Sequence, residues 1–199
     1  YVEAQLRELI TLSERVSGIR FDIDRLREYM GHANVMSEGW RRVLELNRTR
    51  PAVFNALSDG TIFLGVANGF RGTAEGAAYF RDLVEEMEHK AARGIGTATA
   101  EQWRLLFVGV PCYPIFRRFH EMFADQGGVF VASSYLWFAA GGLDLGFQYD
   151  LSRPIESLAA AAALAATWDG FVLPACARRR RFPRPRRSDS TKSPSPPGS

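Results

Sequence analysis

Cysteine and histidine are both scarce in this chain, which has two cysteines and three histidines among 199 residues. The cysteines, Cys112 and Cys176, are too few for a disulfide framework, and neither has a neighbour at zinc-finger spacing. We therefore exclude a disulfide-rich fold and expect a reducing compartment. The histidines lie far apart, with no second ligand three or four positions away, so we interpret each as a packed or solvated side chain: His32, His89 and His120.

Long apolar runs and nucleotide-binding loops are also missing. No run approaches the ~20 apolar residues that a membrane-spanning helix needs, and residues 1–4 open into an amphipathic pattern without the basic start of a signal peptide. No G-x-x-x-x-G-K-S/T sequence occurs, so we expect a chain that does not itself use ATP. We expect a cytoplasmic protein with no membrane partner. Because Tyr1 stands within a helical pattern, we interpret the sequence as a fragment.

The positive charge of the chain is concentrated in its tail. Residues 177–199 hold eight basic side chains and one acid, a net +7, so the whole chain's +3 leaves −4 for residues 1–176. The net charge therefore indicates no nucleic-acid partner for the folded part. Arg, Pro and Ser dominate the tail, and we expect a disordered basic segment there. A second hypothesis is a reading frame lost between Ala160 and Cys176, since a G+C-rich gene read out of frame yields such runs.

Apolar residues at helical spacing predict a mainly helical segment over residues 1–100. A first helix covers residues 2–16. A second covers residues 22–50 and ends where a proline pushes the preceding residue away from helical dihedrals. A third covers residues 73–94 and begins at a capping threonine. The apolar run 62–66 fits strand and helix templates equally, so both remain open.

Residues 105–137 have the pattern of a β-loop-α-β unit. The unbroken apolar run 105–110 suits a parallel strand covered on both faces, and a second strand follows a glycine pair. A helix over 154–167 and a further strand over 168–173 come next. We expect an α/β fold in which residues 101–176 form an incomplete Rossmann-like or flavodoxin-like parallel sheet behind the helical segment. The inward stripe of the crossover helix is expected to comprise Ile115, Phe116, Phe119, Met122 and Phe123.

The loop after the first strand and the segment after the second, interpreted as a loop, are expected at one edge of this sheet. Ligands bind at the carboxyl ends of parallel strands, where helix N-termini also leave backbone N–H groups unpaired. Aromatic side chains after the second strand either line a pocket for a flat apolar substrate or pack in the core: Tyr135, Trp137, Phe138, Phe147 and Tyr149. The candidate substrate-pocket residues are Val110, Pro111, Tyr113, Ser133, Ser134, Tyr135 and Trp137.

Cys112 stands between the first strand and the following helix, where the helix dipole favours a thiolate. A thiolate serves as a nucleophile or as an iron or zinc ligand. The alternative is a small buried residue in a proline-bounded turn. One cysteine cannot hold a four-iron cluster, so its companions would lie outside this chain or on another subunit.

Several long segments carry a family resemblance. LLFVGVPCYPIFRRF (105–119) and SSYLWFAAGGLDLGFQYDLSRPIESLA (133–159) resemble the large subunits of benzoyl-CoA reductases, which belong to the 2-hydroxyacyl-CoA dehydratase family. The segments FDIDRLREYMGHANVMSEGWRRVLELNR (21–48) and LGVANGFRGTAEGAAYFRDLVEEMEHK (64–90) are similar to the same family. The resemblance covers residues 1–160.

The resemblance implies an oxidoreductase subunit of anaerobic aromatic catabolism, in an ATP-dependent, ferredoxin-driven enzyme that reduces benzoyl-CoA to a cyclic diene-carboxyl-CoA. It implies a [4Fe-4S] cluster on the full-length subunit, a sister large subunit as partner, and separate activator subunits that hydrolyse ATP. The family's cluster cysteines lie mainly in segments absent here. We therefore expect the fragment alone to be inactive and without a stable cluster, with Cys112 as a candidate ligand and Cys176 without a role.

Two other interpretations remain open. One is a 2-hydroxyacyl-CoA dehydratase subunit, in which a low-potential electron creates a ketyl radical and water is lost. The other is a non-catalytic binding or assembly module that uses the basic tail as an electrostatic arm.

Overall fold

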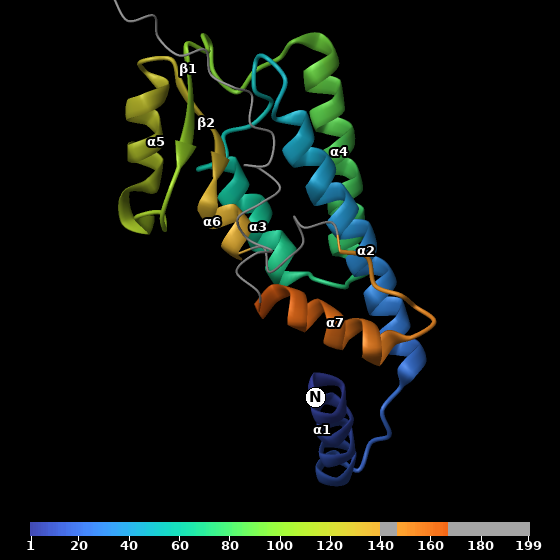
Figure 1. Cartoon of the computed structure of the whole chain (residues 1–199). Helices are drawn as coiled ribbons and strands as arrows, with labels where there is room; N and C mark the ends of the chain where they lie inside the picture. Colours follow the sequence, from blue (N-terminus) through green and yellow to red (C-terminus); the bar gives the residue numbers. More distant parts are fainter. Residues whose placement is uncertain (140–146, 167–199) are drawn as a thin grey trace, which may run out of the picture.

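The computed structural model describes residues 1–139 and 147–166, and its mostly helical first part is followed by a small parallel sheet, which confirms the α/β class. Figure 1 shows α2 and α4 side by side, and α5 on the side of the sheet that faces away from them. The elements in chain order are α1 (Val2–Ser17), α2 (Ile23–Leu46), α3 (Asp59–Gly69), α4 (Ala74–Arg93), β1 (Trp103–Phe107), the short 3-10 helix η1 (Tyr113–Ile115), α5 (Phe116–Ala124), β2 (Gly128–Ser133), α6 (Ser134–Ala139) and α7 (Pro154–Ala166).

Side-chain caps fix where the helices begin. Asp22 Oδ1 accepts the backbone N–H groups of Asp24 and Arg25 at 2.9 and 3.0 Å, and Thr73 Oγ1 accepts that of Gly76 at 3.0 Å. These oxygens satisfy donors that the first turn leaves unpaired, so both predicted starts are confirmed. The predicted helix over 73–94 is likewise confirmed, because Gly94 ends α4 in the left-handed region with φ of 66°.

Two sequence predictions about the helices are resolved or corrected by the structure. The run 62–66, left open between strand and helix, lies in α3, where Phe63, Leu64 and Ala67 are buried and Ile62 is exposed. The second helix does not continue to residue 50 but ends at Leu46. The cap residue, Asn47, forms side-chain hydrogen bonds with the backbone of Phe54 and Val131. The helix therefore ends before the Arg50-Pro51 peptide bond, which is cis.

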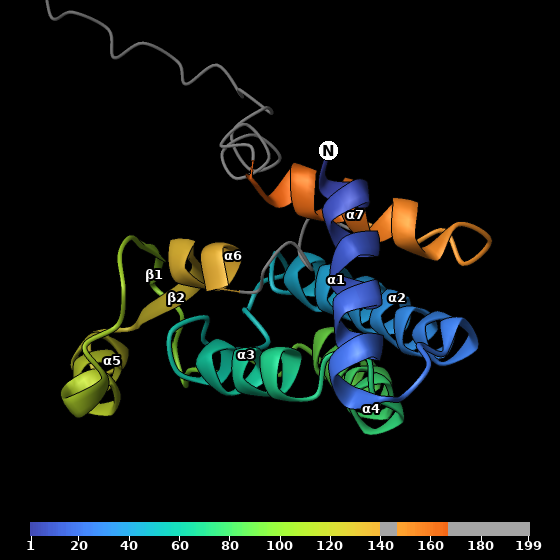
Figure 2. The same ribbon diagram turned by 90° about the horizontal axis from the view of Figure 1, so that it is seen from below.

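The core of the helical part lies between α2, α3 and α4. Trp40 and Phe80 are almost fully buried and meet edge to face with ring centroids 5.8 Å apart. Gly39 allows this close approach, because a Cβ atom there would lie 2.9 Å from Phe80 Cβ. α7 packs on α1, where Arg7 and Glu156 form an ion pair at 3.2 Å, and Figure 2 shows the two helices crossing each other.

The two strands pair in parallel, as predicted, with a β-bulge in β2. The register passes from Leu105↔Phe130 to Leu106↔Ala132, which leaves Val131 without a partner on β1. α5 covers one face of the sheet, where Phe119 stacks on Phe130 with centroids 6.0 Å apart.

Coverage of the sheet differs from the prediction. Trp103 and Leu106 of β1 are 64% and 56% exposed, so the expected cover on both faces is wrong for the described residues. β1 is one of only two described strands, so among the described residues no strand pairs with its outer side. The predicted inward stripe is also narrower, because Ile115 and Met122 are 54% and 59% exposed and Phe123, although it packs on Phe130, is 37% exposed.

A buried asparagine and an arginine join α2 to the sheet. Asn47, at the end of α2, donates from Nδ2 to the carbonyl of Val131 at 2.9 Å and accepts the N–H of Phe54 at 3.1 Å. Arg104 of β1 donates to the carbonyls of Asn47 and Thr49 at 2.8 and 2.9 Å. The Asn47 amide thus satisfies the carbonyl that the bulge leaves unpaired, and the sheet is held at a fixed place against the helices.

The Arg104 guanidinium also forms an ion pair with Glu101 at 2.6 Å, and the second oxygen of that carboxylate accepts the N–H of Ala52 at 2.5 Å. Both side chains are mostly buried, with exposed fractions of 18% and 8%. These two charged groups, although mostly buried, are therefore paired with each other and with the backbone of the residues after α2.

None of the helices in the described part of the chain combines the length and the apolar character that crossing a membrane requires. The predicted strand at 168–173, Cys176 and the basic tail at 177–199 lie outside the described residues.

We predict that Asn47→Ala lowers the free energy of unfolding by about 2–4 kcal/mol, because it removes two hydrogen bonds and leaves buried partners unsatisfied. Urea denaturation followed by circular dichroism measures this change. Gln126→Ala, at an exposed position beyond α5, is the control and is expected to change the value by less than about 0.5 kcal/mol. An Asn47→Ala protein as stable as the control would contradict this account of the joint.

Candidate functional site

The carboxyl ends of β1 and β2 bring two distant parts of the sequence together. The N–H of Gly109, in the loop after β1, donates to Ser134 Oγ at the start of α6 at 3.0 Å. Parallel strands end at the same edge of a sheet, so the loop after each strand meets its neighbour there. The predicted meeting of these two segments is therefore present in the structure.

The second of these segments is not the predicted loop. Ser134 begins α6 directly after β2, and Ser133 Oγ accepts the N–H of Tyr135 at 3.2 Å. Ser133 is only 2% exposed, and its hydroxyl satisfies a backbone donor of the first helical turn. A serine pair that resembles a loop in sequence thus serves as the start of a short helix.

Two tyrosine hydroxyl groups meet at this edge. Tyr113 Oη of η1 and Tyr135 Oη of α6 lie 2.5 Å apart, and the rings meet edge to face with centroids 6.2 Å apart. The hydrogen bond with Tyr135, with a smaller effect of burial, raises the pKa of Tyr113 to about 12. The shift therefore extends the pH range over which Tyr113 keeps its proton to above pH 10.

Cys112 directly precedes η1, and its side chain is exposed. Its carbonyl accepts the N–H of Ile115 at 3.0 Å, which closes the turn that carries the thiol. The structure therefore does not support the alternative of a small buried cysteine. An exposed sulfur is accessible to a ligand or to a neighbouring subunit.

The other candidate pocket residues divide by exposure. Val110 is 66% exposed and lies beside Pro111, which is buried. Of the aromatic group predicted after β2, Tyr135 contacts Tyr113, while Phe147 and Tyr149 pack on each other with centroids 5.2 Å apart. The side chains of Trp137 and Phe138 lie outside the described residues.

Few metal ligands gather in the described part of the chain. Cys112 is its single cysteine, and no three His, Cys, Asp or Glu side chains between residues 1 and 139 or 147 and 166 lie close enough to hold a metal ion. A [4Fe-4S] cluster takes four thiolates, and the described residues supply one. This donor set does not fit such a cluster by itself.

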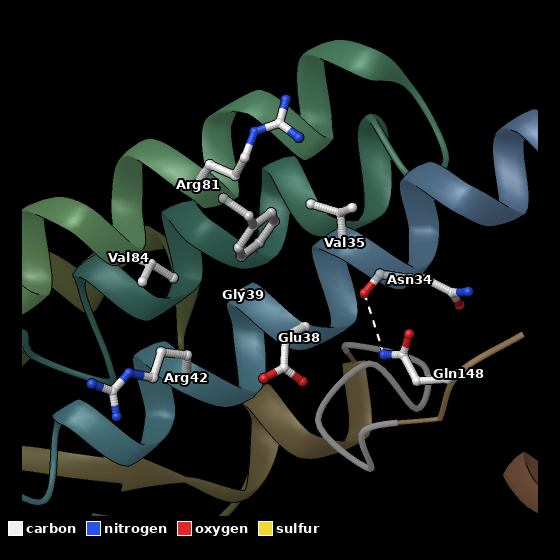
Figure 3. A pocket seen from close by; sticks show the side chains of 9 residues that line it. Asn34, Val35, Glu38, Gly39, Arg42, Arg81, Val84 and Gln148 are labelled. Carbon is white, nitrogen blue, oxygen red and sulfur yellow. Dashed lines mark hydrogen bonds between the residues drawn. The ribbon is translucent and has the colours of Figure 1, made fainter.

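A second concave surface, which we did not expect from the sequence, lies between α2, α4 and the segment before α7. Asn34 holds that segment, because its Oδ1 accepts the N–H of Tyr149 at 2.6 Å and its carbonyl accepts from Gln148 Nε2 at 3.3 Å. The hollow has a volume of about 450 Å³ (Figure 3). It is lined by Asn34, Val35, Glu38, Gly39, Arg42, Phe80, Arg81, Val84 and Gln148.

Two of the charged groups that line this hollow already have partners. Arg42 contacts Glu88 at 2.7 Å, and Glu38 contacts Arg41 at 2.5 Å. The edge of the sheet is therefore the better candidate site, since it combines an exposed thiol, an apolar surface and a polar pair.

Comparisons with known proteins agree with the resemblance seen in the sequence. A family model described as 2-hydroxyglutaryl-CoA dehydratase, D-component, matches residues 1–180. One of the benzoyl-CoA reductase subunits of Thauera aromatica is 39% identical over 168 residues, which is 80% of this chain and 38% of that protein. The alpha subunit of (R)-2-hydroxyglutaryl-CoA dehydratase of Acidaminococcus fermentans is 32% identical over 115 residues, or 57% of this chain and 24% of that protein.

The alpha subunit of (R)-phenyllactyl-CoA dehydratase of Clostridium sporogenes is 28% identical over 136 residues, which is 68% of this chain and 33% of that protein. The chain thus spans well under half the length of each of these three relatives. All three are subunits of enzymes named for acyl-CoA substrates. Since the family match extends over most of its length, the chain belongs to the 2-hydroxyglutaryl-CoA dehydratase D-component family.

Proposed function

We propose that this chain is part of a subunit of a benzoyl-CoA reductase, an ATP-dependent and ferredoxin-driven enzyme that reduces benzoyl-CoA to a cyclic diene-carboxyl-CoA. The observation that carries the proposal is the edge where the loop after β1 meets α6, with an exposed thiol, apolar surface and tyrosine hydroxyls at the carboxyl ends of parallel strands. Sites of this kind bind ligands in open α/β sheets. The 39% identity to a benzoyl-CoA reductase subunit, against 28–32% to dehydratase subunits, supports the choice of substrate.

An aryl thioester suits the chemistry of this edge. Val110 and Ile115 offer exposed apolar surface, and the ring of Tyr113 stands between them in the sequence. Burying a flat apolar group against such surface lowers the free energy of binding, and the polar thioester can form hydrogen bonds with the hydroxyl groups. Val110, Pro111, Tyr113, Ser133, Ser134, Tyr135 and Trp137 remain the proposed pocket residues, with the buried Pro111 and Ser133 supporting the others.

The proposed partners are a sister large subunit and separate activator subunits that hydrolyse ATP, with ferredoxin acting through them. Because the described residues do not fit a [4Fe-4S] cluster alone, a cluster would need thiolates from outside the described chain. Cys112 is a proposed ligand or a residue of the substrate cleft, since its sulfur is exposed at this edge.

A 2-hydroxyacyl-CoA dehydratase subunit is the second candidate. The family description and the 32% identity to the alpha subunit of (R)-2-hydroxyglutaryl-CoA dehydratase favour it. The two candidates share the thioester and differ in the acyl group, so binding distinguishes them.

We predict that benzoyl-CoA binds the chain at least about tenfold more tightly than (R)-2-hydroxyglutaryl-CoA in calorimetric titrations, because an apolar acyl group suits this surface. Val110→Glu should weaken benzoyl-CoA binding by about tenfold, since it places a carboxylate on the apolar surface. Val16→Glu, 78% exposed against 66% for Val110 and placed on α1 away from the sheet (Figure 1), is the control.

The reverse preference would favour the dehydratase. Salt-dependent nucleic-acid binding that vanishes when residues 178–199 are removed, without acyl-CoA binding, would favour the assembly module.

A second prediction concerns iron. Anaerobic reconstitution of the chain with iron and sulfide should give no complete four-iron spectrum, because the whole sequence has two cysteines. Iron and acid-labile sulfide analysis, with the electronic absorption spectrum, measures the outcome. Cys112→Ser is the matched variant, and a full cluster lost in this variant would show that the chain assembles one without partners.

A further inference from the structure

The two tyrosine hydroxyls at the sheet edge have one more donor than their mutual contact uses. Each phenol carries one proton, and the contact between Tyr113 Oη and Tyr135 Oη at 2.5 Å uses one of the two. Whichever residue donates, the other retains an O–H group that has no acceptor within the described part of the chain. The pair therefore presents a hydrogen-bond donor to a third group.

The surroundings make this donor accessible to a ligand. Tyr113 is 49% exposed, and the hydroxyl pair lies at the surface. The apolar side chains of Val110 and Ile115, 66% and 54% exposed, are neighbours of this residue in the chain. A ligand that combines an oxygen acceptor with an apolar group suits this combination.

Backbone contacts hold the two tyrosines in place before a ligand binds. Ser134 Oγ accepts the N–H of Gly109 at 3.0 Å, which ties the loop that leads to Tyr113 to the start of α6. Ser133 Oγ accepts the N–H of Tyr135 at 3.2 Å. A donor fixed in this way loses little conformational entropy on binding.

We propose that the Tyr113–Tyr135 pair donates a hydrogen bond to the carbonyl oxygen of the bound acyl thioester. This inference rests on the proposed function and adds the group that orients the thioester. A hydrogen bond between two hydroxyls polarises both and strengthens the donation from the second O–H.

The test compares two ligands that differ only in the carbonyl group. The chain is titrated with benzoyl-CoA and with S-benzyl coenzyme A, a thioether in which a CH₂ group replaces the carbonyl. The double variant Tyr113→Phe/Tyr135→Phe, which leaves no hydroxyl at this place, should weaken benzoyl-CoA binding by about five- to tenfold and thioether binding by less than about twofold. Each single variant should lose less than the double variant, because the remaining hydroxyl keeps its own proton and loses only the neighbour that polarises it.

Tyr29→Phe is the matched control. Tyr29 lies on α2, is 41% exposed, and its hydroxyl accepts a hydrogen bond from Arg25 Nε at 2.8 Å. Its loss should leave both affinities unchanged.

Each outcome decides a separate point. Equal losses for thioester and thioether would assign the tyrosines to ring packing and overturn the inference, as would a double variant that binds like wild type while the proposed function stands. A wild-type chain that binds neither compound would overturn the proposed function and the inference together.

The hydroxyl contact also predicts a dependence of stability on pH. The pKa of Tyr113 is raised from 10.0 to about 12, mainly by the bond to Tyr135, so the folded state keeps this proton over a range in which the unfolded state loses it. The stabilisation is complete below about pH 10 and is lost as the pH rises towards 12. Urea denaturation should show a steeper loss of stability between these values in wild type than in Tyr135→Phe, and identical slopes would show that the contact does not form.

Discussion

The buried amide of Asn47 is the constraint on which the position of the sheet depends. It links the end of α2, the residues after it and the bulge of β2 in one set of hydrogen bonds, and Arg104 adds β1 to the same joint. A two-stranded sheet is not stable alone in water. Its edge can carry a defined site only because these polar contacts and the aromatic packing under α5 hold it in one orientation.

The site at the sheet edge follows from this orientation and from parallel pairing. The strands end on the same side, so Gly109 and Ser134, 25 positions apart, form a hydrogen bond. The short η1 and α6 helices then place Tyr113 and Tyr135 opposite each other. The polar pair thus results from the topology of the chain and not from any local sequence motif.

The sequence predicts best what depends on neighbours in the chain. The caps at Asp22 and Thr73 and the parallel order of β1 and β2 are local patterns, and all are confirmed. The end of α2 was predicted too late because Asn47 takes partners as distant as Val131. The exposure of Trp103 and the contact of Tyr113 with Tyr135 depend on what lies beside them in space, which periodicity does not contain.

The two edges of the sheet, one along β1 and one along β2, differ in their backbone hydrogen bonds. The outer side of β2 is occupied, since Phe130 and Val131 give their carbonyls to Ala56 and to the Asn47 amide. Among the residues described, the β1 backbone makes no such contacts on its outer side. A third strand, from whatever source, could therefore join this sheet only next to β1, and the sheet has a single direction of growth.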